Sequence, residues 1–359
     1  MKKILSAFIA IVITCGILIF GNYQLAHSAN PDHHEEKVLN LFNWGDYIDP
    51  KLVKKFERTT GYKVTIQTFD SNESMIEKIR QGGISYDLTV PSEYMVEKMK
   101  NMNLLIPIDL SRIHNQNNID PEFMNRNFDP HNQYSLPYFW GTLGIVYNDK
   151  YVKPQEVQHW QDLWDPKFKN SLLLIDSVRD IFAVSLITMD KSINTKDYQT
   201  LLQARDRLVK LTPNVKAIVA DEIKMYMEQE ESYLAVDWSG EAREMMSVNP
   251  HLHYVVPNEG SNIWLDNFVI PRTAKHFDAI YKFLNFMNEP ENAAQNTKYV
   301  GYSTPNRAAK KNLPRSIVEN KSFYPAETTM EHLDTYRDLG QEIVEDYNDL
   351  YLEFKMSRQ

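Results

Sequence analysis

The pattern of apolar and polar residues after position 37 predicts strands that alternate with helices. Residues 38–42 form an apolar-rich run, which indicates a buried strand. A helix is predicted to begin at Pro50, with Asp49 as its N-cap, and to close at Gly61. Two similar units follow, with strands at 62–69 and 86–90 and helices opened near Ser71 and Ser92. Successive strand–helix units predict a parallel sheet with right-handed crossovers.

A second α/β region and two long extended stretches follow. The predicted elements of this region are a strand at 171–176, a helix at 177–189, a helix at 221–231 and short strands at 216–220 and 233–236. Residues 134–148 and 254–270 are predicted to be extended, and to cross between the two regions. After Pro271 the chain is predicted to be helical to its end, apart from a turn at 301–305.

These elements predict an α/β protein with two lobes joined by paired hinge strands. A chain of 359 residues exceeds the usual size of a single core. We expect residues 38–141 with 262–310 to form lobe 1, and residues 142–261 with 311–359 to form lobe 2.

The N-terminus carries the features of an export signal. Lys2 and Lys3 precede an apolar run at 4–20, and Ala26-His27-Ser28 offers a small-x-small cleavage site. We therefore interpret residues 1–29 as a signal peptide or membrane anchor, and 30–37 as a linker. Cys15 lacks the small residue before it and the polar residues after it that a lipoprotein signal requires. The expected location is the periplasm or the outer face of the cytoplasmic membrane, where residues 4–20 would serve as an anchor if retained.

Charge and cysteine content exclude several classes of function. Without residues 1–29, 37 basic residues stand against 48 acidic ones, a net charge of −11. Such a chain repels nucleic acid and suits a cationic ligand. Cys15 is the only cysteine, so a cleaved chain has no thiol chemistry and no disulfide. We expect no cofactor and no metal site, because no nucleotide-binding or metal-binding motif is present.

Aromatic and acidic residues gather where the predicted strands end. In open α/β sheets, ligands bind beyond the carboxyl ends of the strands, so these residues are expected to face one cleft between the lobes. The candidates at these ends and on the second crossing are Trp44, Asp46, Tyr47, Ser92, Tyr94, Ser177, Asp180, Trp238, Trp264 and Asp266.

Several candidates have a structural alternative. Ser92 suits an ordinary N-cap, and Asp180, three residues after Ser177, suits a capping box. Trp140, Trp160 and Trp164 are interpreted as packing residues. Asp266 is harder to explain structurally, because an unpaired charge beside an apolar strand is costly to bury. Carboxylates for ammonium groups and flat aromatic walls for a methylene stem fit a diamine or triamine.

In these stretches the chain resembles the spermidine/putrescine-binding proteins of polyamine ABC importers. The matching motifs, in order, are NWGDYI at 43–48, FDSNE at 69–73, YDLTVPS at 86–92, YSLPY at 134–138, SLLL at 171–174, IWLD at 263–266 and GYSTPN at 301–306. The resemblance implies a type II periplasmic-binding-protein fold. It also implies that Asp180 and Asp266 bind the amines, that Ser92 lies near them, and that an aromatic box forms from Trp44, Tyr47, Tyr94, Trp238, Trp264 and Tyr302.

The sequence departs from the family pattern at three places. An acidic D-x-x-E pattern appears here as Ser177-Val178-Arg179-Asp180, so one carboxylate is missing. A family glutamine near the last helix falls at about Leu333-Asp334, and Gly45 replaces a hydroxyl residue. A third amine would then need another anchor, for which Asp46, Asp237 or Glu241 are the candidates. These departures concern the preferred polyamine.

The resemblance implies the permease subunits of an ABC importer as partners, and a polyamine as the ligand. The chain is expected to be a monomer without catalytic activity and without a nucleic-acid partner. Two alternatives stay open. One is a binding protein for another cationic solute, such as thiamine or a metal complex. The other is an exported hydrolase that uses paired carboxylates.

Overall fold

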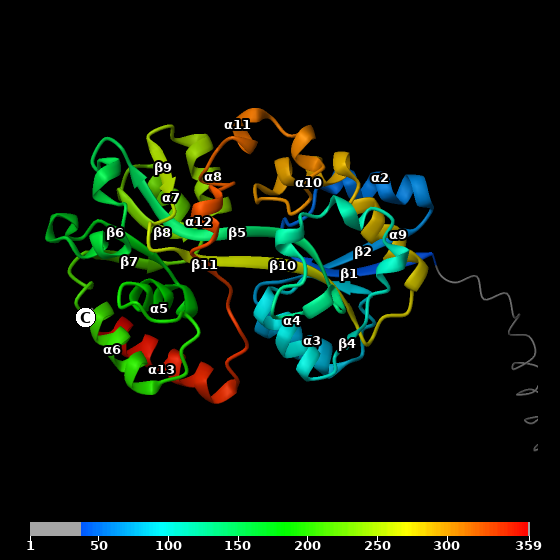
Figure 1. The fold of residues 1–359 in the computed structure, drawn as a ribbon, viewed down its shortest axis with the longest axis horizontal. Coiled ribbons are helices and arrows are strands. Elements are labelled where there is room, and N and C mark those ends of the chain that lie inside the picture. Colours follow the sequence, from blue (N-terminus) through cyan, green and yellow to red (C-terminus); the bar gives the residue numbers. More distant parts are fainter. Residues whose placement is uncertain (1–36, 358–359) are drawn as a thin grey trace, which may run out of the picture. The chain divides into compact units, whose positions relative to one another are not determined.

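The computed structural model describes residues 37–357 (Figure 1). The predicted signal peptide or anchor at 1–29, and all of the linker except Lys37, lie outside these residues. Within residues 37–357, no helix combines the length and apolar character needed to cross a membrane.

The first three strands form a parallel sheet in the order β2-β1-β3. The strands are β1 (Val38–Trp44), β2 (Lys63–Phe69) and β3 (Leu88–Thr89), and the helices that follow them are α2 (Pro50–Thr60), α3 (Asn72–Gln81) and α4 (Glu93–Asn101). This arrangement confirms the predicted strand–helix units. β3 is shorter than predicted: the backbone N–H of Tyr86 donates to the hydroxyl of Thr273, whereas the N–H of Asp87 donates to the carbonyl of Asn40 in β1.

The second α/β region has the same construction. Its parallel strands are β6 (Leu172–Ile175), β7 (Val215–Val219) and β8 (Leu234–Trp238), and its helices are α5 (Val178–Ile187), α6 (Tyr198–Val209), α7 (Glu222–Glu228) and α8 (Ser239–Val248). Sequence analysis identified all of these except α6 and α8.

Two long antiparallel strands, β5 (Ser135–Asn148) and β10 (Ser261–Pro271), connect the two regions (Figure 1). The short strand β4 (Leu105–Ile106) pairs with β10, and β9 (Leu252–Val255) pairs with β5. The predicted extended stretch at 254–270 is therefore interrupted, at 256–260, where Gly260 adopts a φ of 98°. The sheet is continuous from β2 to β7 through these two strands.

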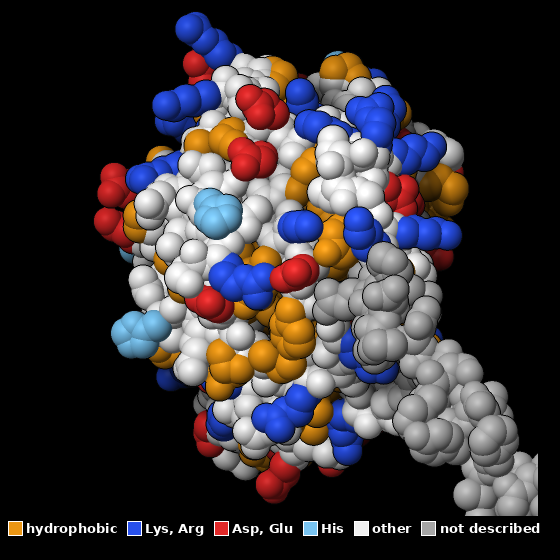
Figure 2. Space-filling view, turned by 90° about the vertical axis from the view of Figure 1, so that its right-hand side faces the viewer, with side chains coloured by type: hydrophobic (Ala, Val, Ile, Leu, Met, Phe, Trp, Pro, Cys, Tyr) orange, Lys and Arg blue, Asp and Glu red, His pale blue; other side chains and the backbone are white. Residues whose placement is uncertain are grey.

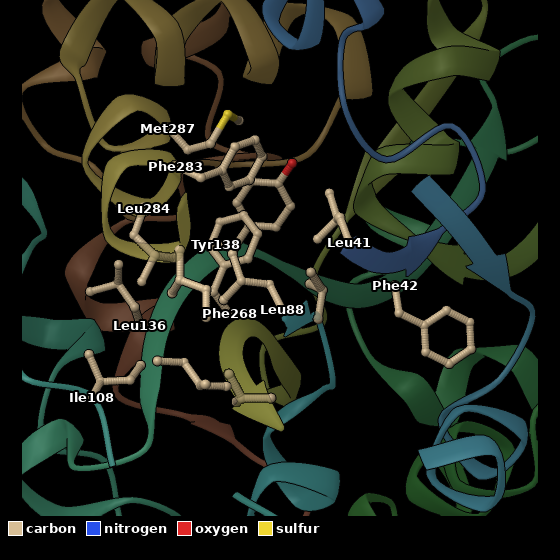
Figure 3. Close-up of a cluster of buried hydrophobic side chains, with 14 of the residues drawn as sticks. Leu41, Phe42, Leu88, Ile108, Leu136, Tyr138, Phe268, Phe283, Leu284 and Met287 are labelled. Carbon is tan, nitrogen blue, oxygen red and sulfur yellow. The ribbon is translucent and has the colours of Figure 1, made fainter. Parts of the chain in front are cut away.

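Separate hydrophobic cores lie on the two sides of this connection. The first contains Leu41, Phe268 and Phe283, and in Figure 3 Tyr138 lies among them. The second contains Leu143, Leu174 and the C-terminal helix. Trp140 and Trp160 are buried in the first and second core, as expected for packing residues, and Trp164 packs half-buried against the second. The lobe boundaries stay a prediction.

The predicted turn at 301–305 contains no helix, as expected, but the expectation of a helical chain is wrong for residues 306–340. Prolines at 314 and 325 limit helix length there. The elements are α9 (Phe277–Met287), α10 (Pro290–Val300), α11 (Arg315–Val318), α12 (Glu327–Met330), β11 (Leu333–Asp334) and α13 (Gln341–Met356). Short 3₁₀ turns occupy Leu110–Arg112, Gln116–Asn118, Pro121–Phe123, Pro130–Asn132, Pro154–Glu156, Trp160–Trp164, Pro166–Phe168 and Ala309–Asn312.

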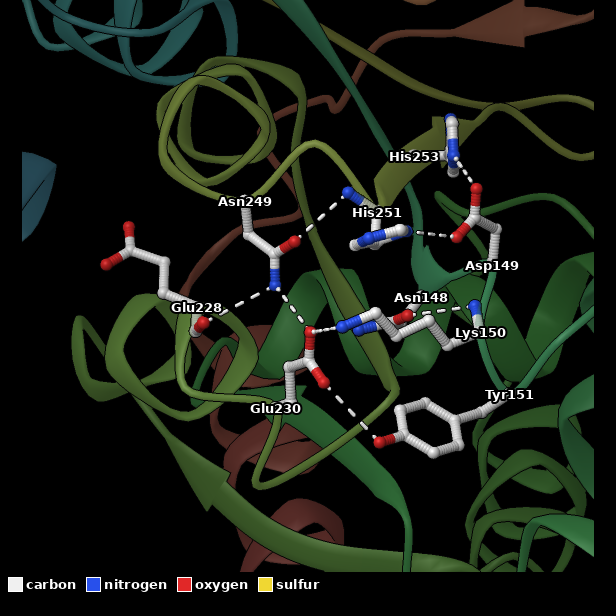
Figure 4. A network of polar contacts seen from close by, with 9 residues as sticks. All are labelled: Asn148, Asp149, Lys150, Tyr151, Glu228, Glu230, Asn249, His251 and His253. Carbon is white, nitrogen blue, oxygen red and sulfur yellow. Dashed lines mark hydrogen bonds and ion pairs between the residues drawn. The ribbon is translucent and has the colours of Figure 1, made fainter.

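An exposed polar network fixes the start of β9 to the chain that leaves β5 (Figure 4). The two carboxylate oxygens of Asp149 lie 2.9 Å from His251 Nδ1 and 2.9 Å from His253 Nε2. Hydrogen bonds from His253 and His251 lower the pKa of Asp149 below its usual value. Beside them, Lys150 Nζ lies 2.6 Å from Glu230 Oε1. These contacts join the segment after β5 to the start of β9 and to Glu230.

Asp49 caps α2 as predicted, and it also ties the helix to α10. Its carboxylate accepts from Lys51 N–H at 2.8 Å and from Gln295 Nε2 at 2.7 Å. Asp49→Ala should lower the free energy of unfolding by about 1 kcal/mol, the typical cost of losing an N-cap. Asp49→Asn keeps an acceptor and should lose much less. Chemical denaturation of the two variants measures the difference, and equal stability of both would contradict a capping role.

Candidate functional site

Asp266 lies at the centre of a buried hydrogen-bonded group on β10. The residue is only 6% exposed. Its carboxylate accepts from the hydroxyl of Tyr47 at 2.7 Å and from the hydroxyl of Ser92 at 2.7 Å. The strand is irregular between Asp266 and Asn267, where the pairing with β5 shifts register. Three residues predicted for the site, from distant parts of the sequence, therefore meet at one carboxylate.

The two donors to Asp266 are held in place by their own neighbours. The backbone oxygen of Tyr47 accepts from the hydroxyl of Tyr138 at 2.7 Å. Asn72 accepts from the backbone N–H of Ser92 at 3.1 Å and donates to its hydroxyl at 3.1 Å. Ser92 occupies the N-cap position of α4, yet its side chain makes no capping bond to the helix. The hydroxyl is directed to the carboxylate of Asp266 instead.

Asp180, in the first turn of α5, forms the second buried acidic centre. It is 4% exposed and accepts three hydrogen bonds from neutral groups. The donors are Ser177 Oγ at 2.7 Å, Trp238 Nε1 at 3.2 Å and the hydroxyl of Tyr336 at 2.6 Å. No side-chain capping bond forms at Ser177. The capping-box alternative for Ser177 and Asp180 is therefore absent here.

Aromatic rings from the first core lie against the backbone of β5 and α8. The rings of Trp264 and Tyr302 are 4.7 Å apart and nearly perpendicular, and Tyr47 lies 5.8 Å from Tyr302. A Cβ atom at Gly240 would lie 1.9 Å from the ring of Tyr302, and one at Gly141 would lie 2.3 Å from Trp264. Glycine is required at both positions for the rings to approach this closely.

Three candidates lie outside these hydrogen-bonded groups. Trp44 is half-buried and donates its indole N–H to the carbonyl of Val90 at 2.8 Å. Tyr94 packs beside Tyr336, and its hydroxyl lies 3.2 Å from Glu73 Oε1. Asp46 is exposed, in a loop with a left-handed φ of 51°. The assignment of these three residues to the ligand site stays a prediction.

Burial, rather than nearby negative charge, dominates the electrostatics of the acidic groups. It raises the pKa of Asp266 to about 6 and the pKa of Asp180 above its usual value. Asp237, on β8, is 2% exposed, and burial raises its pKa well above the usual range. Glu241 accepts from the hydroxyl of Tyr302 at 3.2 Å and lies 2.8 Å from Lys224 Nζ. A cation placed among these carboxylates would favour their ionised forms.

Two residues that organise the site were not predicted. Tyr336 donates to Asp180 from the segment just after β11. The one hint of Tyr336 in the sequence was the family glutamine, which falls at about Leu333-Asp334, two residues before Tyr336. Glu93 is completely buried, and burial raises its pKa to about 8. In the sequence it looks like an ordinary acidic residue in the first turn of α4.

The comparisons with known proteins identify the class to which this fold and site belong. Residues 51–322 match the family model of bacterial extracellular solute-binding proteins. The spermidine/putrescine-binding periplasmic protein of Salmonella typhimurium is 37% identical over 350 residues, which cover 97% of this chain and 98% of that protein. The protein of the same description from Escherichia coli is 38% identical over 318 residues, which cover 87% and 91%.

A solved structure extends this similarity to the fold. The spermidine/putrescine ABC transporter substrate-binding protein of Streptococcus pneumoniae, in complex with calcium and HEPES, is 52% identical, with a TM-score of 0.84. The match covers 90% of this chain and 99% of that chain. The fold is the predicted two-lobed periplasmic-binding-protein fold of type II. The chain belongs to the bacterial extracellular solute-binding protein family.

The raised pKa of Asp266 predicts how its ionisation affects stability. The folded-state value of about 6 lies above the ordinary value near 4, so the ionised carboxylate costs stability above pH 6. This cost disappears as the pH falls through 6 toward 4. Without ligand at pH 7.5, Asp266→Asn should therefore be at least as stable as the parent, by up to about 3 kcal/mol. Chemical denaturation at several pH values measures this, with exposed Asp190→Asn as the control. A variant that is less stable at pH 7.5 would identify Asp266 as a structural carboxylate.

Proposed function

We propose that this protein is the extracytoplasmic substrate-binding subunit of an ABC importer and that it captures polyamines such as putrescine and spermidine. One observation carries the proposal. Among residues 37–357, the two buried carboxylates of Asp266 and Asp180 accept side-chain hydrogen bonds only from hydroxyl and indole donors, and aromatic rings lie beside them. Neutral donors fix a carboxylate without cancelling its charge, so a cationic ligand supplies the missing partner.

The carboxylates and the aromatic rings are proposed to bind different parts of the ligand. Ammonium groups bind the carboxylates through charge-assisted hydrogen bonds. The rings of Trp264 and Tyr302 provide walls for the methylene stem, and each cation–π contact contributes roughly 0.5–2 kcal/mol. A micromolar ligand requires about 8 kcal/mol. For about ten heavy atoms this is about 0.8 kcal/mol per atom, which lies below the ceiling for small ligands.

We propose that selection of the ligand depends on the residues of this site. The face in Figure 2 carries basic and acidic side chains interleaved, with no continuous acidic area. We propose that the permease subunits recognise the ligand-bound protein and that no chemistry is performed on the ligand. The named relatives, which are polyamine-binding proteins, support this assignment over a hydrolase. A protein for another cationic solute is the second candidate.

Titration calorimetry of the purified protein with putrescine, cadaverine, spermidine and spermine tests the proposal. At least one polyamine should bind with a micromolar or lower Kd. Asp266→Asn should weaken it at least about tenfold, or about 1.4 kcal/mol, because one ammonium loses its charged partner. Asp190→Asn, an exposed position, should leave the affinity unchanged. No heat with any polyamine, or turnover of a glycoside, would reject the function.

Ser177 predicts the selectivity between diamines and triamines. Its hydroxyl donates to Asp180 at 2.7 Å, where the family pattern has a second carboxylate. With one carboxylate fewer, a third ammonium lacks a partner, and a desolvated ammonium is costly. Ser177→Asp should therefore shift the ratio of putrescine to spermidine affinity towards spermidine. Ser177→Asn, which adds similar bulk without charge, is the control. If the ratio is unchanged, or shifts towards putrescine, Ser177 serves only as a neutral hydrogen-bond donor to Asp180.

A further inference from the structure

Residues 333–339, which we call the crossover segment, lie between α4 and α5 and lead into α13 (Figure 1). Its first residues form β11, which pairs with the start of β10. Arg337 binds Glu97 of α4 through two hydrogen bonds, at 3.0 and 2.7 Å. On the other side, Asn194 donates to the carbonyl of Thr335 at 2.8 Å and accepts from the N–H of Arg337 at 2.9 Å. The segment therefore contacts both α/β regions.

Glu93 connects this segment to the strand that carries Asp266. One of its carboxylate oxygens accepts from the backbone N–H of Leu265 at 2.9 Å, and the other accepts from the backbone N–H of Tyr336 at 3.0 Å. Leu265 directly precedes Asp266. The hydroxyl of Tyr336 donates to Asp180 at 2.6 Å. A short path of hydrogen bonds and covalent bonds thus joins the two acidic centres through Glu93.

We propose that Glu93 is a positioning residue that sets the spacing between the two ligand carboxylates, Asp266 and Asp180, and so selects the length of the diamine. This inference rests on the proposed function. Glu93 does not itself bind the ligand, because each of its oxygens holds a backbone N–H. A buried carboxylate that holds two backbone groups fixes both of them, since leaving either N–H unpaired in the interior is costly.

Glutamine at this position tests the idea with little change of shape. Its carbonyl oxygen can accept from one backbone N–H, but its amide NH₂ group then faces the other, and two donors cannot pair. Glu93→Gln should thus release either Leu265 or Tyr336 and loosen the distance between the acidic centres. Glu97→Gln, one turn later on α4, perturbs the same segment through Arg337 without touching Leu265 or Tyr336. It is the matched control.

The readout is the pattern of Kd values for diamines of three, four, five and six carbons, measured by titration calorimetry. The parent should bind one length at least about tenfold more tightly than its neighbours. In Glu93→Gln this preference should shrink to about threefold or less, whereas Glu97→Gln should keep it. Tyr336→Phe, which keeps the backbone contact to Glu93 but releases Asp180, should also reduce the preference.

Each other outcome has a definite meaning. Equal weakening of all four diamines by Glu93→Gln, with the preference intact, would overturn the inference, as would loss of preference in Glu97→Gln. A parent that binds all four lengths equally would also overturn it, because no spacing would then be fixed. A parent that binds no diamine rejects the proposed function itself. If Glu93→Gln does not fold, the result with Tyr336→Phe decides, and an unchanged preference there overturns the inference.

Discussion

The burial of the Asp266 carboxylate is the constraint on which the rest of the site depends. Taking an ionised carboxylate out of water costs several kcal/mol, even when hydrogen bonds partly compensate. Here the compensation comes from Tyr47 and Ser92, which are neutral, so the charge is oriented but not cancelled. The supporting contacts of Asn72 and Tyr138 make sense in this light, because they hold the two donors in position. In the proposed function, this loss of local stability keeps an anion ready for a cationic ligand.

The same arrangement at Asp180 shows how a nearby arginine is kept from neutralising the site. Arg179 is adjacent in sequence, yet its guanidinium lies over the rings of Tyr336 and Tyr347. Its hydrogen bonds go to Asn194 and to the carbonyls of Ile193 and Arg337. A bidentate arginine–carboxylate pair would be strong, and a ligand ammonium would have to displace it. Stacking instead leaves Asp180 with neutral donors only among its hydrogen bonds.

Sequence alone predicted the residues that local patterns mark, and missed those that act through long-range contacts. The strand ends identified Tyr47 and Ser92, because parallel strands bring their carboxyl ends to one edge. Asp266 was identified on the second crossing, because an unpaired charge beside an apolar strand is costly to bury. Periodicity likewise predicted β1 to β3 and the cap of α2. The segment at 306–340 was mispredicted, since its extended parts are held by contacts with α4 and β10 rather than by local preference. Glu93 and Tyr336 were missed for the same reason: their partners are backbone groups and carboxylates more than 150 residues away.

In the proposed function, these long-range contacts tie ligand coordination to the relation between the lobes. The hinge strands β5 and β10 fix where the chain crosses but leave the two acidic centres on different elements, β10 and α5. The crossover segment adds a third passage, and Tyr336 on it supplies a donor to Asp180. Tyr302 makes a corresponding contact from the first core, with its ring on Gly240 of α8 and its hydroxyl at Glu241. Since each acidic centre is completed by residues from elsewhere, a movement of the lobes changes the binding groups themselves. Under this proposal, closure of the lobes and coordination of a two-ended cation would be one event rather than two.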